Sequence, residues 1–406
     1  MKERPITAAL WALALLSLGT NLVPIVNGSQ GYDTGPLWQA VRALLDGGSV
    51  YTERGAGDLL YPPSALLMLL PLGAFSLAWA SRIFFVVDLV TILVAAAVLL
   101  HLFGLRWRGT SGAIALFGIS LAWPVLFTLD AGNVNGPILL GLSLFLLAAA
   151  RLRWTAAGVF LGATLALKPI LAPLLIVVML YRRWRTVLIA LALPAVLSGV
   201  VLAAAPATRG FFDTTVPLLV RGQNQKIQDV SVALRSMADR LSIPDPITAA
   251  LVVAVLLVTI VLLWRRWNWD EVEPRRLVEL SSIALVGAFI VSTFAFRHYG
   301  IFLLPLAISL ADATSPYRDW LTAGALFCIA SPVGWQLDLL PARVNDVLAE
   351  RFTFALLLLL VSSWLAFRRA REVDLSAEAS SPAVGLRARA TAWIVPASSS
   401  RGVERS

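Results

Sequence analysis

Apolar runs of about 20 residues recur along most of the chain, and each is long enough to cross a bilayer as a helix. Of the 406 residues, 58% are hydrophobic and 14% are charged, whereas soluble domains carry roughly 25% charged residues. Because the bilayer core offers no partners to backbone hydrogen-bonding groups, such runs must form helices that bond internally. We therefore predict an all-α, polytopic transmembrane protein with about ten to twelve membrane helices.

Composition argues against a cysteine or histidine metal site and against nucleic acid, and no cofactor is expected. The single cysteine, Cys328, excludes an internal disulfide and a cysteine metal cluster. With only two histidines, His101 and His298, a histidine-rich metal site is not expected either. The net charge of +9 is explained by basic residues that fix membrane topology. Membrane lipids are therefore expected partners, and nucleic acid is not.

Clusters of basic residues predict the topology. Each is placed in the cytoplasm; they are Lys2/Arg4, Arg106/Arg108, Arg151/Arg153, Arg182/Arg183/Arg185, Arg265/Arg266 with Arg275/Arg276, and Arg368/Arg369/Arg371. The spans then run alternately outward and inward over 7–26, 77–104, 111–128, 137–150, 187–205, 247–264, 277–295, 299–311, 319–334 and 352–368. Both termini lie in the cytoplasm. Residues 1–372 form the membrane domain in the plasma (inner) membrane, and the polar tail 373–406 is predicted to be disordered.

The segment 155–181 conflicts with this alternation, because it starts and ends beside cytoplasmic arginine clusters. It contains "LALKPILAP", residues 165–173, in which Lys168 stands among apolar residues and Pro169 cannot donate a helical hydrogen bond. Two short helices that meet at Lys168-Pro169 and return to the same side resolve the conflict. Irregular backbone at this depth is tolerated where it lines a polar cavity or is buried in protein.

The first outer loop is predicted to contain a surface helix. Asp33-Thr34-Gly35-Pro36 is typical of a helix start, and Leu37, Val41, Leu44 and Leu45 then repeat at helical spacing up to Gly47-Gly48. An amphipathic helix of this kind lies along a membrane surface. Tyr61-Pro62-Pro63 begins a second short, apolar helix.

Polar residues gather at the outer ends of the predicted spans, and each has a plain structural alternative. They include Asp33, Asn133, Asn135, Arg221, Asn224, Lys226, Arg297 and His298. Asp33 alone is explained as a helix N-cap, and Lys168 or Asp88 as an internally paired intramembrane charge. The loop cations are explained as solvated groups or headgroup partners, and His298 as a satisfied loop histidine.

Taken together, these residues favour group transfer from a lipid phosphate. Lysine and arginine supply the charge and donors that a phosphate needs, and a nearby carboxylate suits a general base for a hydroxyl. The rival class is a transporter or lipid-sugar flippase, since transporters also use broken helices and midplane charges. No clear internal repeat supports that alternative.

Several segments resemble glycosyltransferase family 87 of the GT-C superfamily. They are the stretch from Asn27-Gly28 through Asp33, Pro36 and Ala40, then "LLYPPSALLMLLPLG", "GNVNGPILLGLSLFLL", "AGVFLGATLALKPILAPLLIVVMLYRRWR" and "FRHYGIFLLPLAISL". The resemblance covers roughly residues 20–310, and within the family it is strongest to the mycobacterial arabinofuranosyltransferases that make α-(1→3) branches. The "RGQNQKIQD" loop departs from that pattern, so the resemblance leaves the acceptor open.

The resemblance implies an enzyme, a polyprenyl-phosphate-dependent glycosyltransferase. The donor would be decaprenyl-phosphoryl arabinofuranose and the acceptor a cell-wall polysaccharide, arabinogalactan or lipoarabinomannan. An acceptor hydroxyl would attack the anomeric carbon with inversion at a site that faces the outside. A pentosyltransferase is favoured over a hexosyltransferase, with a polyprenyl-phosphate-mannose-dependent mannosyltransferase as the alternative.

The residues receive roles on this reading. Asp33 is the predicted general base. Lys168 is the first choice for the donor phosphate, with help from Arg297, His298, Arg221 and Lys226. The predicted substrate-binding residues are Tyr61, Asn133, Asn135 and Asn224.

Overall fold

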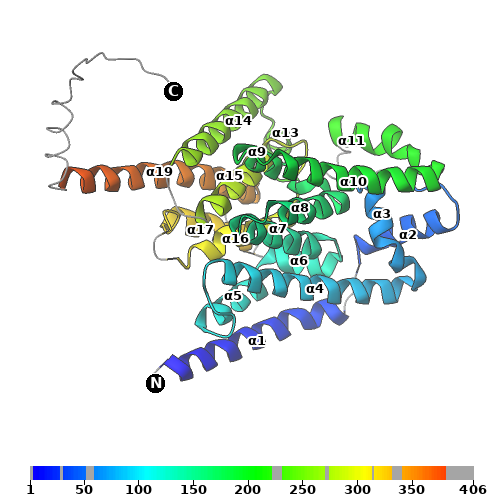
Figure 1. Ribbon diagram of the computed structural model, residues 1–406, viewed down its shortest axis with the longest axis horizontal. Coiled ribbons are helices and arrows are strands. Elements are labelled where there is room, and N and C mark those ends of the chain that lie inside the picture. The colour runs from blue at the N-terminus through cyan, green and yellow to red at the C-terminus, as the bar shows by residue number, and fades with distance from the viewer. Residues whose placement is uncertain are drawn as a thin grey trace, which may run out of the picture.

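The computed structural model describes residues 3–27, 31–51, 59–221, 231–269, 274–312, 315–331 and 341–380. Over these ranges the chain is a bundle of helices (Figure 1), and the only β-type pairing is an isolated bridge between Ser231 and Phe296. Five helices are long and apolar enough to cross a membrane: α1 (Glu3–Asn27), α4 (Leu77–Leu102), α10 (Trp184–Ala204), α14 (Asp245–Trp267) and α19 (Arg351–Ser380). The prediction of an all-helical, multi-pass membrane protein is confirmed.

The remaining predicted spans are shorter or broken helices. The predicted count of ten to twelve membrane helices is therefore approached only when these shorter helices are included. They are α5 (Thr110–Leu121), α6 (Trp123–Ala131), α7 (Asn135–Ala150), α8 (Trp154–Leu167), η2 (Pro169–Leu171), α9 (Leu174–Leu180), α15 (Arg275–Val291), η5 (Arg297–Leu303), α16 (Leu304–Ser309) and α17 (Trp320–Ala330). The surface helix predicted after Asp33 is α2 (Thr34–Leu45), and the next apolar helix is α3 (Pro63–Leu69) with η1 (Leu70–Ala74). The other short elements are η3 (Pro206–Arg209), η4 (Phe211–Thr215), α11 (Val216–Arg221), α13 (Leu234–Arg240) and α18 (Ala342–Ala349).

Two predicted spans are wrong as single straight helices. The span 111–128 is α5 followed by α6, bent by 61° at Ala122, whose backbone is extended. Pro124 lies in the first turn of α6, where its missing N–H costs nothing, so a new helix starts there. The span 299–311 is the 3₁₀ helix η5 and then α16, which has Pro305 in its first turn.

The segment 154–181 is a helical hairpin, as the arginine clusters predict. At its open end the Trp154 and Tyr181 rings lie 5.1 Å apart, and the Arg183 guanidinium stacks on Trp154 at 5.2 Å. The Thr186 hydroxyl also donates to the carbonyl of Trp154 at 3.0 Å. The two arms therefore start and finish together, and the break between α8 and α9 at Lys168 and η2 forms the closed end.

Small residues let the first arm of this hairpin pack closely between α7 and α10 (Figure 1). Gly158 and Gly162 stand four positions apart on α8 and face α10. A Cβ at Gly158 would lie 3.0 Å from the carbonyl oxygen of Thr186, and one at Gly162 would lie 3.2 Å from that of Ala190. On the α7 side, a Cβ at Gly141 would lie 2.2 Å from a methyl of Thr164. Such small-residue contacts hold membrane helices together where lipid removes the hydrophobic drive.

Several arginine clusters meet at the open end of the hairpin. The Arg276 guanidinium lies over the Tyr181 ring at 5.5 Å and over the Trp267 ring at 5.3 Å. Nearby, Arg266 of α14 and Glu279 of α15 form an ion pair in which both side chains are fully buried. This common location supports the prediction that the clusters at 182–185, 265–266 and 275–276 share one side of the membrane.

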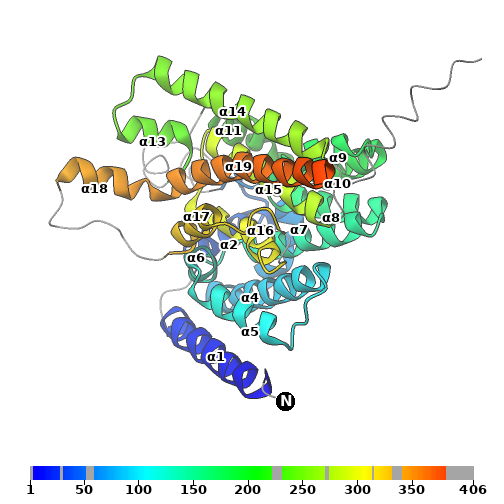
Figure 2. The same ribbon diagram turned by 90° about the vertical axis from the view of Figure 1, so that its left-hand side faces the viewer.

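The first helix packs at one edge of the bundle. Hydroxyl pairs join α1 to α5, Thr7 to Thr110 at 2.8 Å and Ser17 to Ser120 at 2.7 Å. Figures 1 and 2 both show α1 at one edge and α14 at the opposite edge. The last helix, α19, continues to Ser380 and so passes residue 373, the predicted start of the tail. Residues 381–406 lie outside the described ranges.

The close packing of α8 on α10 yields a stability prediction. Gly162→Val should lower the free energy of unfolding by about 1–3 kcal/mol, because the added atoms meet backbone that cannot move aside. The measurement is the thermal unfolding midpoint of the purified protein in detergent. Gly199→Val is the matched control, since nothing lies within 4 Å of a Cβ at Gly199 in α10. Equal midpoints for the two variants would contradict this account of the packing.

Candidate active site

The turn between α6 and α7 holds the chain segment that precedes α2. The backbone N–H of Asp33 donates to the carbonyl of Ala131 at 2.8 Å, and that of Gly31 to Asp130 at 3.3 Å. The Thr34 hydroxyl donates to the carbonyl of Gly132 at 2.7 Å. Gly132 has a φ of +62°, and a Cβ there would lie 2.2 Å from the Thr34 hydroxyl oxygen. A left-handed residue without a side chain is therefore required where the two segments meet.

Asp33 occupies the N-cap position of α2, but its side chain makes no capping hydrogen bond. Burial raises the pKa of this carboxyl, while the charge of Lys168 and the amide of Asn133 act in the opposite direction. The residue is still partly exposed. Capping alone therefore does not account for Asp33, and its carboxylate belongs to a cluster with Lys168 and Asn133.

Lys168 lies at the closed end of the hairpin, where its extended backbone separates α8 from η2. The side chain is 9% exposed, and its ammonium lies over two tyrosine rings, 5.3 Å from the centre of Tyr61 and 5.0 Å from that of Tyr299. Both contacts have cation–π geometry. The Ser64 hydroxyl of α3 donates to the carbonyl of Ala166 at 2.7 Å, which ties the same end of the hairpin to the helix after Tyr61.

The two predicted asparagines lie at the start of α7, and both are fully buried. The Asn133 side-chain oxygen accepts from the backbone N–H of Asn135 at 3.0 Å, and the Asn135 amide donates to the Thr128 hydroxyl at 3.5 Å. The side-chain oxygen of Asn135 has no hydrogen-bond partner within the described residues. The Asn133 side-chain nitrogen is also without a partner there, so each of the two amides leaves one polar atom unused.

His298 lies in η5 between two phenyl rings. Its imidazole stacks on Phe127 at 5.2 Å and on Phe296 at 5.3 Å, with interplanar angles of 7° and 11°. The ring is buried within electrostatic reach of Lys168. Its Nε2 atom has no hydrogen-bond partner in the described parts of the chain. The structure therefore brings His298 into the cluster that holds Asp33 and Lys168.

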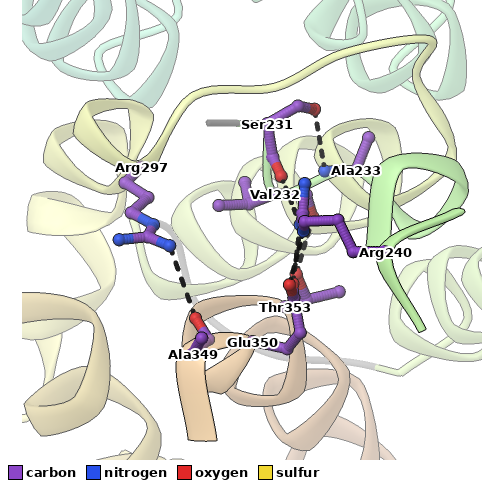
Figure 3. A network of polar contacts seen from close by, with 8 residues as sticks. All are labelled: Ser231, Val232, Ala233, Arg240, Arg297, Ala349, Glu350 and Thr353. Carbon is purple, nitrogen blue, oxygen red and sulfur yellow. Dashed lines mark hydrogen bonds and ion pairs between the residues drawn. The ribbon is translucent and has the colours of Figure 1, made fainter. Parts of the chain in front are cut away.

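Arg297 points to a different network, shown in Figure 3. Its guanidinium donates to the carbonyl of Ala349 at 3.4 Å, and the charges that act on it are those of Arg351, Glu350 and Arg240. In this network Arg240 makes a two-pronged ion pair with Glu350, at 2.5 and 2.7 Å. Arg297 was predicted to help Lys168 bind the donor phosphate. No contact between Arg297 and the Lys168 cluster among the described residues supports that prediction.

The remaining predicted ligands are not placed by the structure. Arg221 is the last residue of α11, but its side chain is outside the description, and Asn224 and Lys226 lie in the range 222–230, which is also outside it. Among the described residues, no group of three or more His, Cys, Asp or Glu side chains could hold a metal ion.

Two members of the cluster did not figure among the predicted site residues. Tyr299 contacts the Lys168 ammonium, and Asp88 is a buried carboxylate of α4 that interacts electrostatically with Asp33. The position of Asp88 inside an apolar run was a signal for it, because ionisable groups at such positions are functional candidates. Tyr299 follows directly after the Arg297-His298 pair, but nothing in the spacing distinguishes a ring that contacts Lys168 from one in the core.

Known proteins resemble the chain over most of its length. The chain is 26% identical to the alpha-(1->3)-arabinofuranosyltransferase of Mycobacterium tuberculosis, over 89% of this chain and 85% of that protein. It is 27% identical to the enzyme of the same name from Mycolicibacterium smegmatis (89% and 86% covered) and 26% identical to that from Corynebacterium glutamicum (82% and 80%). No solved structure matches the chain.

A family model matches residues 59–293, which is more than half of the chain. The matched range includes Tyr61, Asp88, Asn133, Asn135 and Lys168, while Asp33 and His298 flank it. The chain belongs to glycosyltransferase family 87.

Proposed function

We propose that this glycosyltransferase moves an arabinofuranosyl residue from decaprenyl-phosphoryl arabinofuranose to a hydroxyl of a cell-wall arabinan, with inversion and an α-(1→3) linkage. The names of its relatives support the sugar and the linkage. The observation that carries the proposal is that the Asp33 carboxylate lies within electrostatic range of the Lys168 ammonium, which Tyr61 and Tyr299 hold in place. A base for the acceptor and a cation for the departing phosphate are the two groups that such a transfer needs.

In the proposed reaction Asp33 takes the proton of the acceptor hydroxyl as its oxygen attacks the anomeric carbon. The bond from that carbon to the phosphate oxygen breaks, and its electron pair leaves with the lipid phosphate. The raised pKa of Asp33 makes it a stronger base than an exposed aspartate. General base catalysis of this kind contributes about 10²–10⁴ in rate.

Lys168 is proposed to stabilise the phosphate as it leaves. Its ammonium is held by two tyrosine rings in a buried setting, where a fixed charge acts more strongly than in water. The Nε2 atom of His298 has no partner among the residues that the structure describes, so it suits a further contact to the donor. Arg297, Arg221 and Lys226 remain proposed phosphate ligands, and Tyr61, Asn133, Asn135 and Asn224 proposed substrate ligands.

The site is proposed to face the outside of the plasma membrane, with both termini in the cytoplasm. A mannosyltransferase that uses polyprenyl-phosphate mannose and a lipid-sugar flippase are the alternatives. The test incubates membranes that contain the protein with radiolabelled polyprenyl-phosphate arabinose and a synthetic arabinan, in parallel with the mannose donor. Labelled, extended arabinan supports the proposal. Transfer from the mannose donor alone, or lipid movement across the bilayer without a glycan product, would overturn it.

Asp33→Asn should lower kcat by about 10²–10⁴, because the amide cannot accept the acceptor proton. The measurement is the initial rate of transfer from the lipid donor at equal protein levels. Asp46→Asn is the matched control, since Asp46 is exposed at the other end of α2 and pairs with Arg42 at 3.5 Å. A rate for Asp33→Asn within a few-fold of the native rate would remove Asp33 as the base.

The pH dependence of kcat follows from the raised pKa of Asp33. The base works when deprotonated, so the rate should fall as the pH drops through a pKa above the ordinary value of about 4. Lys168 lowers this pKa by its charge, so Lys168→Met should move the acid limb of the profile to higher pH. An acid limb at the same pH in both proteins would show that the two groups do not interact.

Lys168→Ala should also weaken donor binding, because the phosphate loses its buried cation. The measurement is the dissociation constant of the lipid donor, obtained by titrating the purified protein. The control is Arg42→Ala, which removes a cation of α2 whose side chain is 44% exposed. Unchanged affinity in the Lys168 variant would take this residue out of the phosphate site.

A further inference from the structure

Asp88 is a fully buried carboxylate halfway along α4, a helix long and apolar enough to span a membrane. An ionisable group in such a place is costly and needs a partner. One carboxylate oxygen, Oδ1, accepts from the backbone N–H of Gly136 at 3.1 Å, while Oδ2 has no hydrogen-bond partner in the described ranges. Gly136 belongs to the first turn of α7, whose N–H groups have no partners within their own helix.

The contact between Asp88 and Gly136 leaves no room for a side chain. A Cβ at Gly136 would lie 2.5 Å from Asp88 Oδ1, 2.9 Å from the Asp88 Cα and 2.7 Å from the Thr91 hydroxyl oxygen. The backbones of α4 and α7 therefore touch at this point, and the start of α7 is fixed against α4 along the helix axis as well as across it.

The start of α7 is also the place that positions Asp33. The turn just before it receives hydrogen bonds from Gly31, Asp33 and Thr34 through the carbonyls of residues 130–132. Asn133, in the same turn, accepts from the N–H of Asn135 and lies beside the Asp33 carboxylate. A shift of α7 at Gly136 would thus also move the 130–132 turn a few residues before it. Asp33, the proposed base, would move with that turn.

We infer that Asp88 is a positioning residue for Asp33. Asp88 holds the 130–136 turn by accepting a hydrogen bond from the backbone N–H of Gly136. The inference rests on the proposed function, in that it takes Asp33 as the base. It adds a role for a carboxylate that touches neither the donor phosphate nor the acceptor in the proposed reaction.

The kinetic test compares two substitutions of Asp88. Asp88→Leu removes the acceptor for Gly136 and should lower kcat by about 10- to 100-fold with little change in donor KM, because a displaced base loses alignment and not binding. Asp88→Asn keeps an oxygen of the same reach and should restore most of kcat. Thr91→Val is the control, since the Thr91 hydroxyl bonds within α4, to the carbonyl of Val87 at 2.7 Å.

A second measurement does not depend on activity. Cys328 is the only cysteine of the chain, so Cys328→Ala with Asp33→Cys leaves one thiol, at position 33. Its rate of reaction with a maleimide should change several-fold when Asp88→Leu is added and should stay the same with Asp88→Asn or Thr91→Val.

The outcomes separate this inference from the proposed function. A Leu variant with native kcat, or Asn and Leu variants that lose kcat equally, would overturn the positioning role. If the native protein transfers no arabinose, the proposed function fails, and the maleimide labelling rate at position 33 alone tests the positioning role of Asp88. A change confined to Asp88→Leu then supports the positioning of residue 33, and equal rates in all backgrounds overturn it.

Discussion

A buried ammonium within electrostatic range of a carboxylate is the interaction on which the rest of the site depends. Removing Lys168 from water is costly unless its charge is balanced, and the balance comes from Asp33 and from the faces of Tyr61 and Tyr299. These groups belong to four separate parts of the chain, before α2, before α3, at the break after α8 and in η5. Balancing the Lys168 charge therefore requires these four parts of the chain to pack against one another. The site forms only when the helices that carry them are folded.

Two supports bring the charged groups together from different directions. The hairpin carries Lys168, and its depth is set by glycines that let α8 lie against α10 and α7. The turn before α7 carries Asp33 on its carbonyls, and Asp88 fixes the helix that follows the turn. In both places the segments are held by small residues and by hydrogen bonds to backbone groups. Ordering these groups costs little side-chain entropy on folding. The base and the cation are thus held by rigid elements, which is what positioning for transfer requires.

Local patterns predicted the parts of this arrangement that depend on nearby residues. Apolar spacing after Asp33 predicted α2, and Pro169 predicted the break at Lys168, because proline removes a helical hydrogen bond wherever it stands. The bend at Ala122 was missed, since hydropathy is continuous across it. The direction of Arg297 toward Ala349, and the contact of Asp88 with Gly136, depend on helices distant in sequence, and no spacing within a single segment encodes them.

The central claim is that the donor phosphate binds at Lys168 with its sugar toward Asp33. Electron cryo-microscopy of the Asp33→Asn protein with intact polyprenyl-phosphate arabinose tests it most directly, because the donor is then not consumed. We expect phosphate density within about 4 Å of the Lys168 ammonium, the usual limit for an ion pair, and the anomeric carbon on the side of residue 33. Phosphate density away from the Lys168 ammonium would contradict the account.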